Sequence, residues 1–252
     1  GQESCWIRTS PKSAAKKLMV SAAVTNRAGQ GTGWIGISPR AALKKENVVM
    51  SKRLRILQIL NLWRLGPVYW MIFALPKEQR EIVLEEIDHW IKCALRKEQG
   101  RFNRFSALML DMWEYRSLLA YRFSRTGTLQ GAIVRFLFPG MPNLYIATGQ
   151  IGRRFFLQHG FSTVITAKSI GSDCWINQQV TIGYTFDPEP PVIGNGVTVC
   201  AGAKVLGSIT VGDNAIIGAN AVAVKDVPEN AVMGGVPAKI IGENTQHRLF
   251  KK

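Results

Sequence analysis

The sequence has three histidines, and His159 is the one that lies within its repetitive second half. An imidazole titrates near neutral pH, so it can accept the proton of an attacking hydroxyl, a step typically worth about 10²–10⁴-fold in rate. In the register of the repeat described below, Leu157 is expected to point inward. Gln158, His159 and Gly160 would then form a corner from which the imidazole projects outward. The sequence therefore makes His159 the candidate general base.

Three lysines recur on the same segment, which is otherwise nearly uncharged: Lys204, Lys225 and Lys239. Ammonium groups are suitable hydrogen-bond donors to the phosphates of a nucleotide. Lysines on an exterior also serve solubility, so by themselves they do not define a site. No Ser or Cys stands beside His159 in the pattern that covalent catalysis requires, which favours direct attack by the acceptor.

A six-residue repeat sets the expected position of these residues. Branched aliphatic residues recur at Ile170, Ile176, Ile182, Ile193, Val199, Val205, Val211 and Ile217, preceded by Ile151 and Leu157 before a one-residue slip. Small or apolar residues follow most of them by four positions, at Cys174, Val180, Val197, Ala203, Ile209, Ala215 and Ala221. This period fits neither an α-helix nor a simple strand, but it fits a chain wound into a prism. The sequence therefore predicts a parallel β-helix.

Two further features belong to this prediction. Five extra residues between Ile182 and Ile193 predict a loop over residues 184–192. Glycine follows the leading aliphatic residue at Gly152, Gly171, Gly183, Gly194, Gly212 and Gly218. Gly and Asn near the corners tolerate the positive φ angles of tight turns.

Residues 50–143 show helical spacing instead, and we expect an α-helical domain there. The pair Gly66-Pro67 is expected to bend or end the first helix. After Pro76, apolar residues that include Val83, Ile87 and Trp90 share one face of a helix that should stop by Gly100. A third helix is expected over residues 105–124.

Residues 1–49 are expected to be a disordered or misassigned extension, and residues 243–252 a basic tail. The match of residues 31–36 to GxGxxG lacks the strand and helix that a dinucleotide site needs. Four widely spaced cysteines without a CxxC pair favour a reducing compartment, so we expect a cytoplasmic protein. No uncharged apolar run approaches the roughly 20 residues of a membrane-spanning helix.

The net charge of +15 lies mainly in the first two segments. Residues 1–49 hold 8 basic and 2 acidic residues, residues 50–143 hold 15 and 8, and residues 144–252 hold 9 and 7. No nucleic-acid-binding motif accompanies this charge, so no nucleic-acid partner is expected. Contact of the aromatic, basic helices with a membrane surface is an alternative, but core packing explains the aromatic residues with fewer assumptions.

Three stretches carry a family resemblance: residues 201–207 (AGAKVLG), 224–230 (VKDVPEN) and 235–240 (GVPAKI). With them the chain resembles the hexapeptide-repeat acyltransferases, and the serine acetyltransferases in particular, over about residues 75–242. The resemblance implies a left-handed parallel β-helix over residues 144–242, preceded by a small α-helical domain. It also implies a homotrimer or a dimer of trimers, with acetyl-CoA in the groove between neighbouring prisms.

The resemblance assigns roles to individual residues. It makes His159 the catalytic base, and it places Ala201, Gly202, Ala203 and Lys204 beside the pantetheine arm of acetyl-CoA. Gly235, Ala238 and Lys239 would lie near the far end of the coenzyme.

The acceptor side departs from the family pattern. Leu144 stands where the serine acetyltransferases carry the acid that orients the histidine, and Gln158 replaces the acid before it. Residues 187–192 lack the second histidine of the family. Gln158, Gln178, Gln179 and Glu189 are the candidate polar contacts to a small-molecule acceptor.

The sequence thus indicates an acetyl-CoA-dependent O-acetyltransferase that acts on serine. One alternative acceptor is a sugar hydroxyl of a cell-surface polysaccharide. A non-catalytic β-helix scaffold is a further alternative. A zinc hydratase on the same fold needs three His ligands and the repeat offers one, so no metal is expected.

Overall fold

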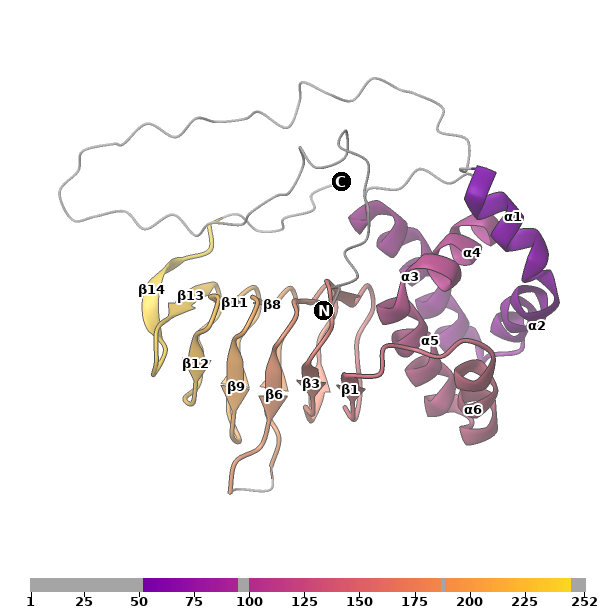
Figure 1. Cartoon of the computed structure of the whole chain (residues 1–252). Coiled ribbons are helices and arrows are strands. Elements are labelled where there is room, and N and C mark those ends of the chain that lie inside the picture. Colours follow the sequence, from indigo (N-terminus) through magenta and orange to yellow (C-terminus); the bar gives the residue numbers. More distant parts are fainter. Residues whose placement is uncertain (1–51, 95–99, 187–188, 246–252) are drawn as a thin grey trace, which may run out of the picture. The chain divides into compact units, whose positions relative to one another are not determined.

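The computed structural model describes residues 52–94, 100–186 and 189–245, which all belong to one compact unit. The expectations for residues 1–49, for the GxGxxG match and for the tail after residue 245 lie outside the described residues. Within the described ranges, the helical segments precede the strands along the chain (Figure 1).

The helical region contains α1 (Lys52–Leu60), α2 (Leu62–Phe73), α3 (Lys77–Cys93), α4 (Arg101–Asp111), α5 (Trp113–Thr126) and α6 (Thr128–Leu137). The helix expected after Pro76 is confirmed as α3, with Val83, Ile87 and Trp90 buried, although it already ends at Cys93. Nowhere in the described ranges is a helix both long and apolar enough to cross a membrane.

Two helix boundaries differ from expectation. Gly66-Pro67 does not end a helix, because α2 runs through Pro67, and Leu65 and Val68 anchor it in the core on either side. The helix expected over residues 105–124 is divided at Met112, whose backbone is extended (φ −119°, ψ 100°). The Arg116 guanidinium caps the end of α4 by donating to the carbonyl oxygens of Met109 (2.6 Å) and Leu110 (2.8 Å).

The strands stack in three parallel sheets. The first holds β1 (Leu144–Ile146), β3 (Thr163–Ile165), β6 (Thr181–Gly183), β9 (Lys204–Leu206) and β12 (Val222–Ala223). The second holds β4 (Ser169–Ile170), β7 (Val192–Ile193) and β10 (Thr210–Val211). The third holds β2 (Phe156–Leu157), β5 (Trp175–Ile176), β8 (Thr198–Val199), β11 (Ile216–Ile217), β13 (Ala231–Gly234) and the antiparallel β14 (Lys239–Glu243).

Successive coils pair in register, as Ile165 with Ile182 and Ile182 with Val205 show. Every leading aliphatic residue of the repeat is buried, and so is every residue expected four positions later, from Cys174 to Ala221. Each buried aliphatic side chain contributes roughly 1.5–3 kcal/mol to stability. The expected fold class, a left-handed parallel β-helix preceded by α-helices, is confirmed.

The glycines that follow the leading aliphatic residues lie where successive coils approach closely. Gly171 is an example, and its φ angle is not positive. A Cβ atom there would lie 2.6 Å from the backbone of Gly194 in the next coil. Positive φ angles occur at corner residues such as Gly202 (75°) and Asn220 (57°), in agreement with the expectation for Gly and Asn, and also at Gln179 (59°).

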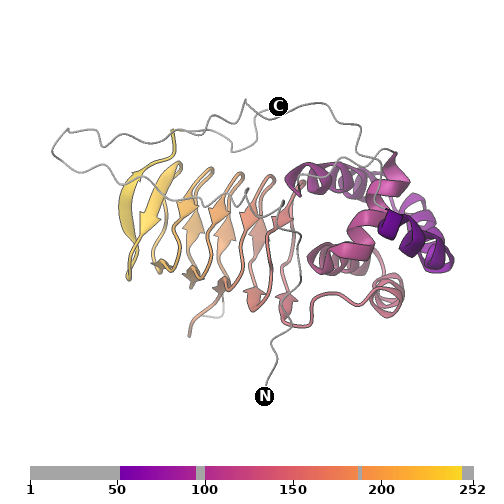
Figure 2. The same cartoon turned by 45° about the horizontal axis from the view of Figure 1, so that its top comes forward.

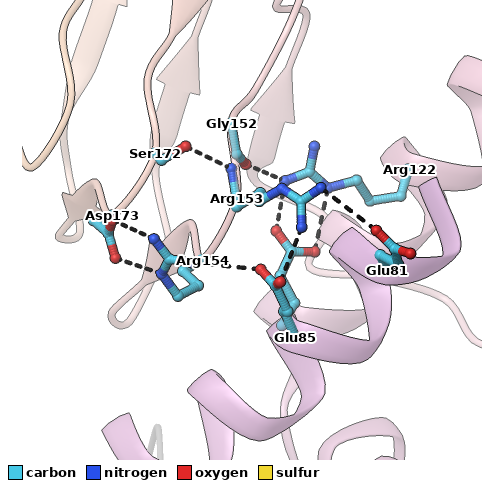
Figure 3. A network of polar contacts seen from close by, with 9 residues as sticks. Glu81, Glu85, Arg122, Gly152, Arg153, Arg154, Ser172 and Asp173 are labelled. Atoms are coloured by element: carbon cyan, nitrogen blue, oxygen red, sulfur yellow. Dashed lines mark hydrogen bonds and ion pairs between the residues drawn. The ribbon is translucent and has the colours of Figure 1, made fainter. Parts of the chain in front are cut away.

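Charged and polar contacts join the helices to the first coil of the β-helix (Figure 3). Arg122 on α5 forms a buried ion pair with Glu86 on α3 (2.5 Å) and donates to the carbonyl oxygens of Ile151 and Gly152. Burial raises the pKa of Glu86, although the Arg122 guanidinium opposes this shift. Nearby, Arg153 pairs with Glu85 (2.9 Å). These contacts fix α3 and α5 against the coil that carries His159.

Candidate active site

The corner after β2 is two residues longer than the corner stacked on it. Three residues separate the inward Ile176 from Val180, whereas five separate Leu157 from Thr163. The hydrogen bonds identify the extra residues: the Gln179 amide donates to Phe161 O, and the Gly202 amide donates in the same way to Gln178 O. Phe161 is therefore equivalent to Gln178, and the inserted residues are His159 and Gly160.

The next corner is one residue shorter than its regular counterpart. Four residues separate Ile165 from Ile170, compared with five between Val205 and Val211. The one-residue slip in the sequence is therefore the sum of an insertion and a deletion. The hydroxyl of the buried Thr163 stabilises the long corner by donating to Phe161 O (3.2 Å).

The side chain of His159 is exposed at this corner, as the sequence indicates. Its backbone is left-handed (φ 55°), a conformation that His, Asn and Asp adopt more readily than other non-glycine residues. Among the described residues, none forms a hydrogen bond or ion pair with the imidazole. The ring is therefore available to a molecule that binds at the corner.

Gln158 is held beside His159 by an aromatic neighbour. Trp175 Nε1 donates to Gln158 Oε1 (3.1 Å) and to Asn177 Oδ1 (2.8 Å). Since the amide oxygen is engaged by Trp175, the amide NH₂ group of Gln158 is the part left to face a ligand. Neither Trp175 nor Asn177 was expected from the sequence to contribute to the site.

A carboxylate from the helical region also reaches this corner. A Cβ atom built on Gly160 would lie 3.4 Å from Glu114 Cγ and 3.3 Å from Leu144 Cδ2. Glu114 lies in the first turn of α5 and is half-buried. Within the described ranges, its carboxylate makes no hydrogen bond or ion pair. Sequence reasoning missed Glu114, because no local pattern relates α5 to a corner 46 residues away.

The expected coenzyme residues lie on the coils stacked next to that of His159. At one corner of these coils, positive φ angles occur at Ser162, Gln179, Gly202 and Asn220. We call this corner the His159 edge. A Cβ atom on Gly202 would lie 2.0 Å from Asn220 Oδ1, so a side chain there would displace the Asn220 amide. Asn220 was missed, although it occupies the same position of the six-residue repeat as Gly202 and Gln179.

Lys204 begins β9 next to this edge, and its ammonium group donates to Gln179 O (2.6 Å). Ala201, Gly202 and Gln178 are partly exposed beside it, so the structure brings these expected residues together with Gln179. Ala203 differs, because its methyl group is buried in the interior and only its backbone can face a ligand. The hydrogen bond from Gly202 N to Gln178 O joins the two neighbouring coils.

The remaining coenzyme candidates lie at the end of the β-helix. Gly235 (φ 90°) begins the turn between β13 and β14, and its carbonyl accepts from Val222 N. Ala238 N donates to Val222 O, and Lys239 opens β14 with an exposed side chain. All three therefore lie on the coil beyond β12, at the far end from His159.

Glu189 is not at the His159 edge within one chain. It belongs to the confirmed loop between β6 and β7, at the next corner of the prism, where it pairs with Lys168 (3.4 Å). Lys225 lies between β12 and Val227, in the connection that corresponds to this loop. The sequence alone did not show at which corner Glu189 lies, because the length of a loop does not indicate the edge of the prism that it covers.

One cysteine lies close to the edge. Burial raises the pKa of Cys200, directly before Ala201, so its thiol remains protonated near neutral pH. A protonated thiol is a poor nucleophile. The described arrangement thus offers one exposed base, His159, on an edge of small residues and backbone groups, with the Glu114 side chain beside it.

The family model described as "Bacterial transferase hexapeptide (six repeats)" matches residues 190–223. The serine acetyltransferase of Bacillus pumilus (strain SAFR-032) is 43% identical over 98 residues, which are 37% of this chain and 45% of that protein. The chain therefore aligns with less than half of that relative's length.

Solved structures extend the likeness over the helices. A Vibrio cholerae serine acetyltransferase structure has a TM-score of 0.54 at 27% identity, covering 70% of each chain. A structure titled as serine acetyltransferase in complex with CoA has a TM-score of 0.51 at 25% identity, covering 69% of this chain and 74% of that one. The repeat over residues 190–223 thus matches a hexapeptide transferase model, and the chain is similar to serine acetyltransferases in sequence over 98 residues and in fold over about 70% of its length.

Proposed function

We propose that the protein is an acetyl-CoA-dependent O-acetyltransferase of the serine acetyltransferase type, with His159 as its general base. The observation that carries this proposal is the exposed imidazole on an inserted corner, in line with the edge formed by Gln179, Gly202 and Asn220. The complex of a related protein with CoA supports acetyl-CoA as the acyl donor.

In the proposed reaction, His159 accepts the proton of the acceptor hydroxyl while the hydroxyl oxygen attacks the carbonyl carbon of the thioester. The carbon–sulfur bond then breaks, and the imidazolium returns its proton to the departing CoA thiolate. The high pKa of Cys200 agrees with direct transfer instead of an acyl-enzyme.

The coenzyme would lie along the His159 edge, next to Ala201, Gly202 and the Ala203 backbone. Lys204 and Lys239 are placed to meet its polar and charged groups. Because the edge of a prism is convex, a groove at this edge needs a second chain beside it. We therefore propose a homotrimer, or a dimer of trimers, that uses Glu189 and its loop from a neighbouring copy. A cytoplasmic location stays a prediction.

The acceptor on this proposal is serine, as in the named relatives. The ammonium group of serine requires an anionic partner, and the acidic side chain of Glu114 touches the inserted corner. A sugar hydroxyl is the second candidate. It is favoured by Leu144 and the Gln158 amide, which leave the rest of the corner uncharged.

The test measures release of free CoA thiol from acetyl-CoA with purified protein, serine and a panel of sugars and glycans. Thiol release with serine that disappears in His159→Asn supports the proposal. Release with a sugar alone would replace serine by the second candidate. No acceptor-dependent release, with protein of native secondary structure, would favour a non-catalytic scaffold.

A further inference from the structure

Three helices of the helical region expose large apolar side chains. On α2, Trp63 and Trp70 are 70% and 76% exposed, and their seven-residue spacing puts them on one face of the helix. On α6, Leu129, Ile133 and Phe136 follow the same spacing, and Phe136 is 85% exposed. These residues, together with Ile59 on α1, form what we call the tryptophan surface.

Specific contacts connect these helices. Arg64, next to Trp63, donates from Nη1 to Leu137 O at the end of α6 (2.9 Å), and its guanidinium lies 4.5 Å from the centre of the Phe138 ring. In the sequence, Trp63 directly precedes Arg64, and Phe136 directly precedes Leu137. A single residue, Asn61, separates α1 from α2. Figures 1 and 2 both place α1 and α2 on the side of the helical region away from the strands, with α6 at its lower edge.

The charge of these helices has one sign. Together α1, α2 and α6 contain five basic residues and no acidic residue. Arg53, Arg55 and Arg135 are exposed next to the apolar side chains. The described acidic residues of the helical region belong to α3, α4 and α5, and Glu85 and Glu86 of α3 face arginines at the β-helix junction. The three helices of the tryptophan surface therefore carry only basic charges.

We propose that the tryptophan surface binds the interface of a lipid bilayer that contains anionic headgroups. Tryptophan favours the level of the headgroups, and arginines beside it attract anionic lipid. The longest of the three helices has 12 residues, or about 18 Å, well short of the roughly 30 Å hydrocarbon layer, so binding is peripheral. This inference concerns a surface separate from the His159 edge and does not depend on the enzymatic activity.

Electrostatics favours lipid over a second copy of the chain as the occupant. In a twofold contact the same patch faces itself, so the basic residues of both copies would be brought together without an acidic residue from α1, α2 or α6 to pair with. An anionic bilayer instead supplies the opposite charge over the whole surface. It also accepts side chains such as Trp70 and Phe136 without a complementary pocket.

The test is flotation of the full-length protein with vesicles of phosphatidylcholine alone or with about 30% phosphatidylglycerol. We expect binding to the anionic vesicles, a blue shift of tryptophan emission, and loss of binding as salt rises from about 0.05 to 0.5 M. The double variant Trp63→Ser/Trp70→Ser should reduce the bound fraction at least about tenfold, and Arg53→Gln/Arg55→Gln should reduce it at low salt. Phe186→Ser, which removes an exposed aromatic residue from the β-helix loop, is the matched control and should bind normally.

Circular dichroism shows whether the variants keep their fold, which these exposed positions should allow. Absence of wild-type binding to anionic vesicles would overturn the proposal. Equal binding to neutral and anionic vesicles would overturn its electrostatic part. If Trp63→Ser/Trp70→Ser leaves vesicle binding intact but lowers the mass measured by light scattering, the surface is an interface between copies of the chain.

Discussion

The side chain of Glu114 lies against Gly160, the residue that follows His159 at the inserted corner. The contact brings an acidic side chain from α5 to the part of the β-helix where Leu144 has an uncharged, aliphatic side chain. We therefore regard Glu114 as a positioning residue for His159 or for the acceptor.

Replacing Glu114 by Gln is expected to lower kcat of the acetyl transfer by about tenfold or more, less than loss of the base itself. Steady-state kinetics at one pH would measure the effect. Glu78→Gln, an exposed change in the first turn of α3, is the matched control and should leave kcat unchanged.

His159→Asn is expected to lower turnover by about 10²–10⁴-fold without a loss of stability. Asparagine tolerates the left-handed backbone at this position, whereas alanine in His159→Ala would add a conformational penalty of about 1 kcal/mol. Thermal unfolding of both variants, measured beside the activity assay, separates the two effects. Residual turnover near the wild-type rate in His159→Asn would assign the base to another group.

The buried pair of Arg122 and Glu86 should matter strongly for stability. Arg122→Met leaves the Glu86 carboxylate buried without its partner, and we expect the free energy of unfolding to fall by about 3–5 kcal/mol. Urea unfolding followed by circular dichroism would measure the loss. The double variant Arg122→Met/Glu86→Leu should recover part of it. A loss below about 1 kcal/mol in the single variant would contradict an ion pair that is shielded from water.

Two tyrosines of α5 give opposite predictions for the same substitution. The Tyr115 hydroxyl is buried and has no hydrogen-bond partner among the described residues, so Tyr115→Phe should stabilise the protein by up to about 1 kcal/mol. The Tyr121 hydroxyl donates to Thr148 O (3.2 Å), so Tyr121→Phe should lower stability by about 1 kcal/mol. Unfolding midpoints of the two variants and of the wild type, measured at one pH, would test both predictions. A destabilising Tyr115→Phe would imply that an ordered water satisfies this hydroxyl.

The β-helix could be predicted from the sequence because its period is local. Each inward position, from Ile151 to Ile217, follows from spacing along the chain alone, and all of them are buried. The division of the helix at Met112 could not be predicted in this way. It depends on Arg116 reaching the carbonyl oxygens at the end of α4, a tertiary detail without a Gly or Pro signal.

The candidate site was predictable only along the repeat. Gln178 meets Gly202 and Lys204 because these residues lie at the same corner of two stacked coils. Glu114 reaches the corner through the packing of a distant helix, and Glu189 lies at a different corner, which the sequence spacing alone does not disclose. The burial of Ala203 follows directly from the repeat, which leaves its backbone as the part that can face a ligand.

His159 and Gly160 are additions to an otherwise regular corner, and the ladder of backbone hydrogen bonds closes behind them through Phe161 O. The fold therefore does not need these two residues, and the coils could stack without them. Selection for a stable prism alone would have no reason to keep such a protrusion. Its length and composition can therefore change while the scaffold behind it stays the same.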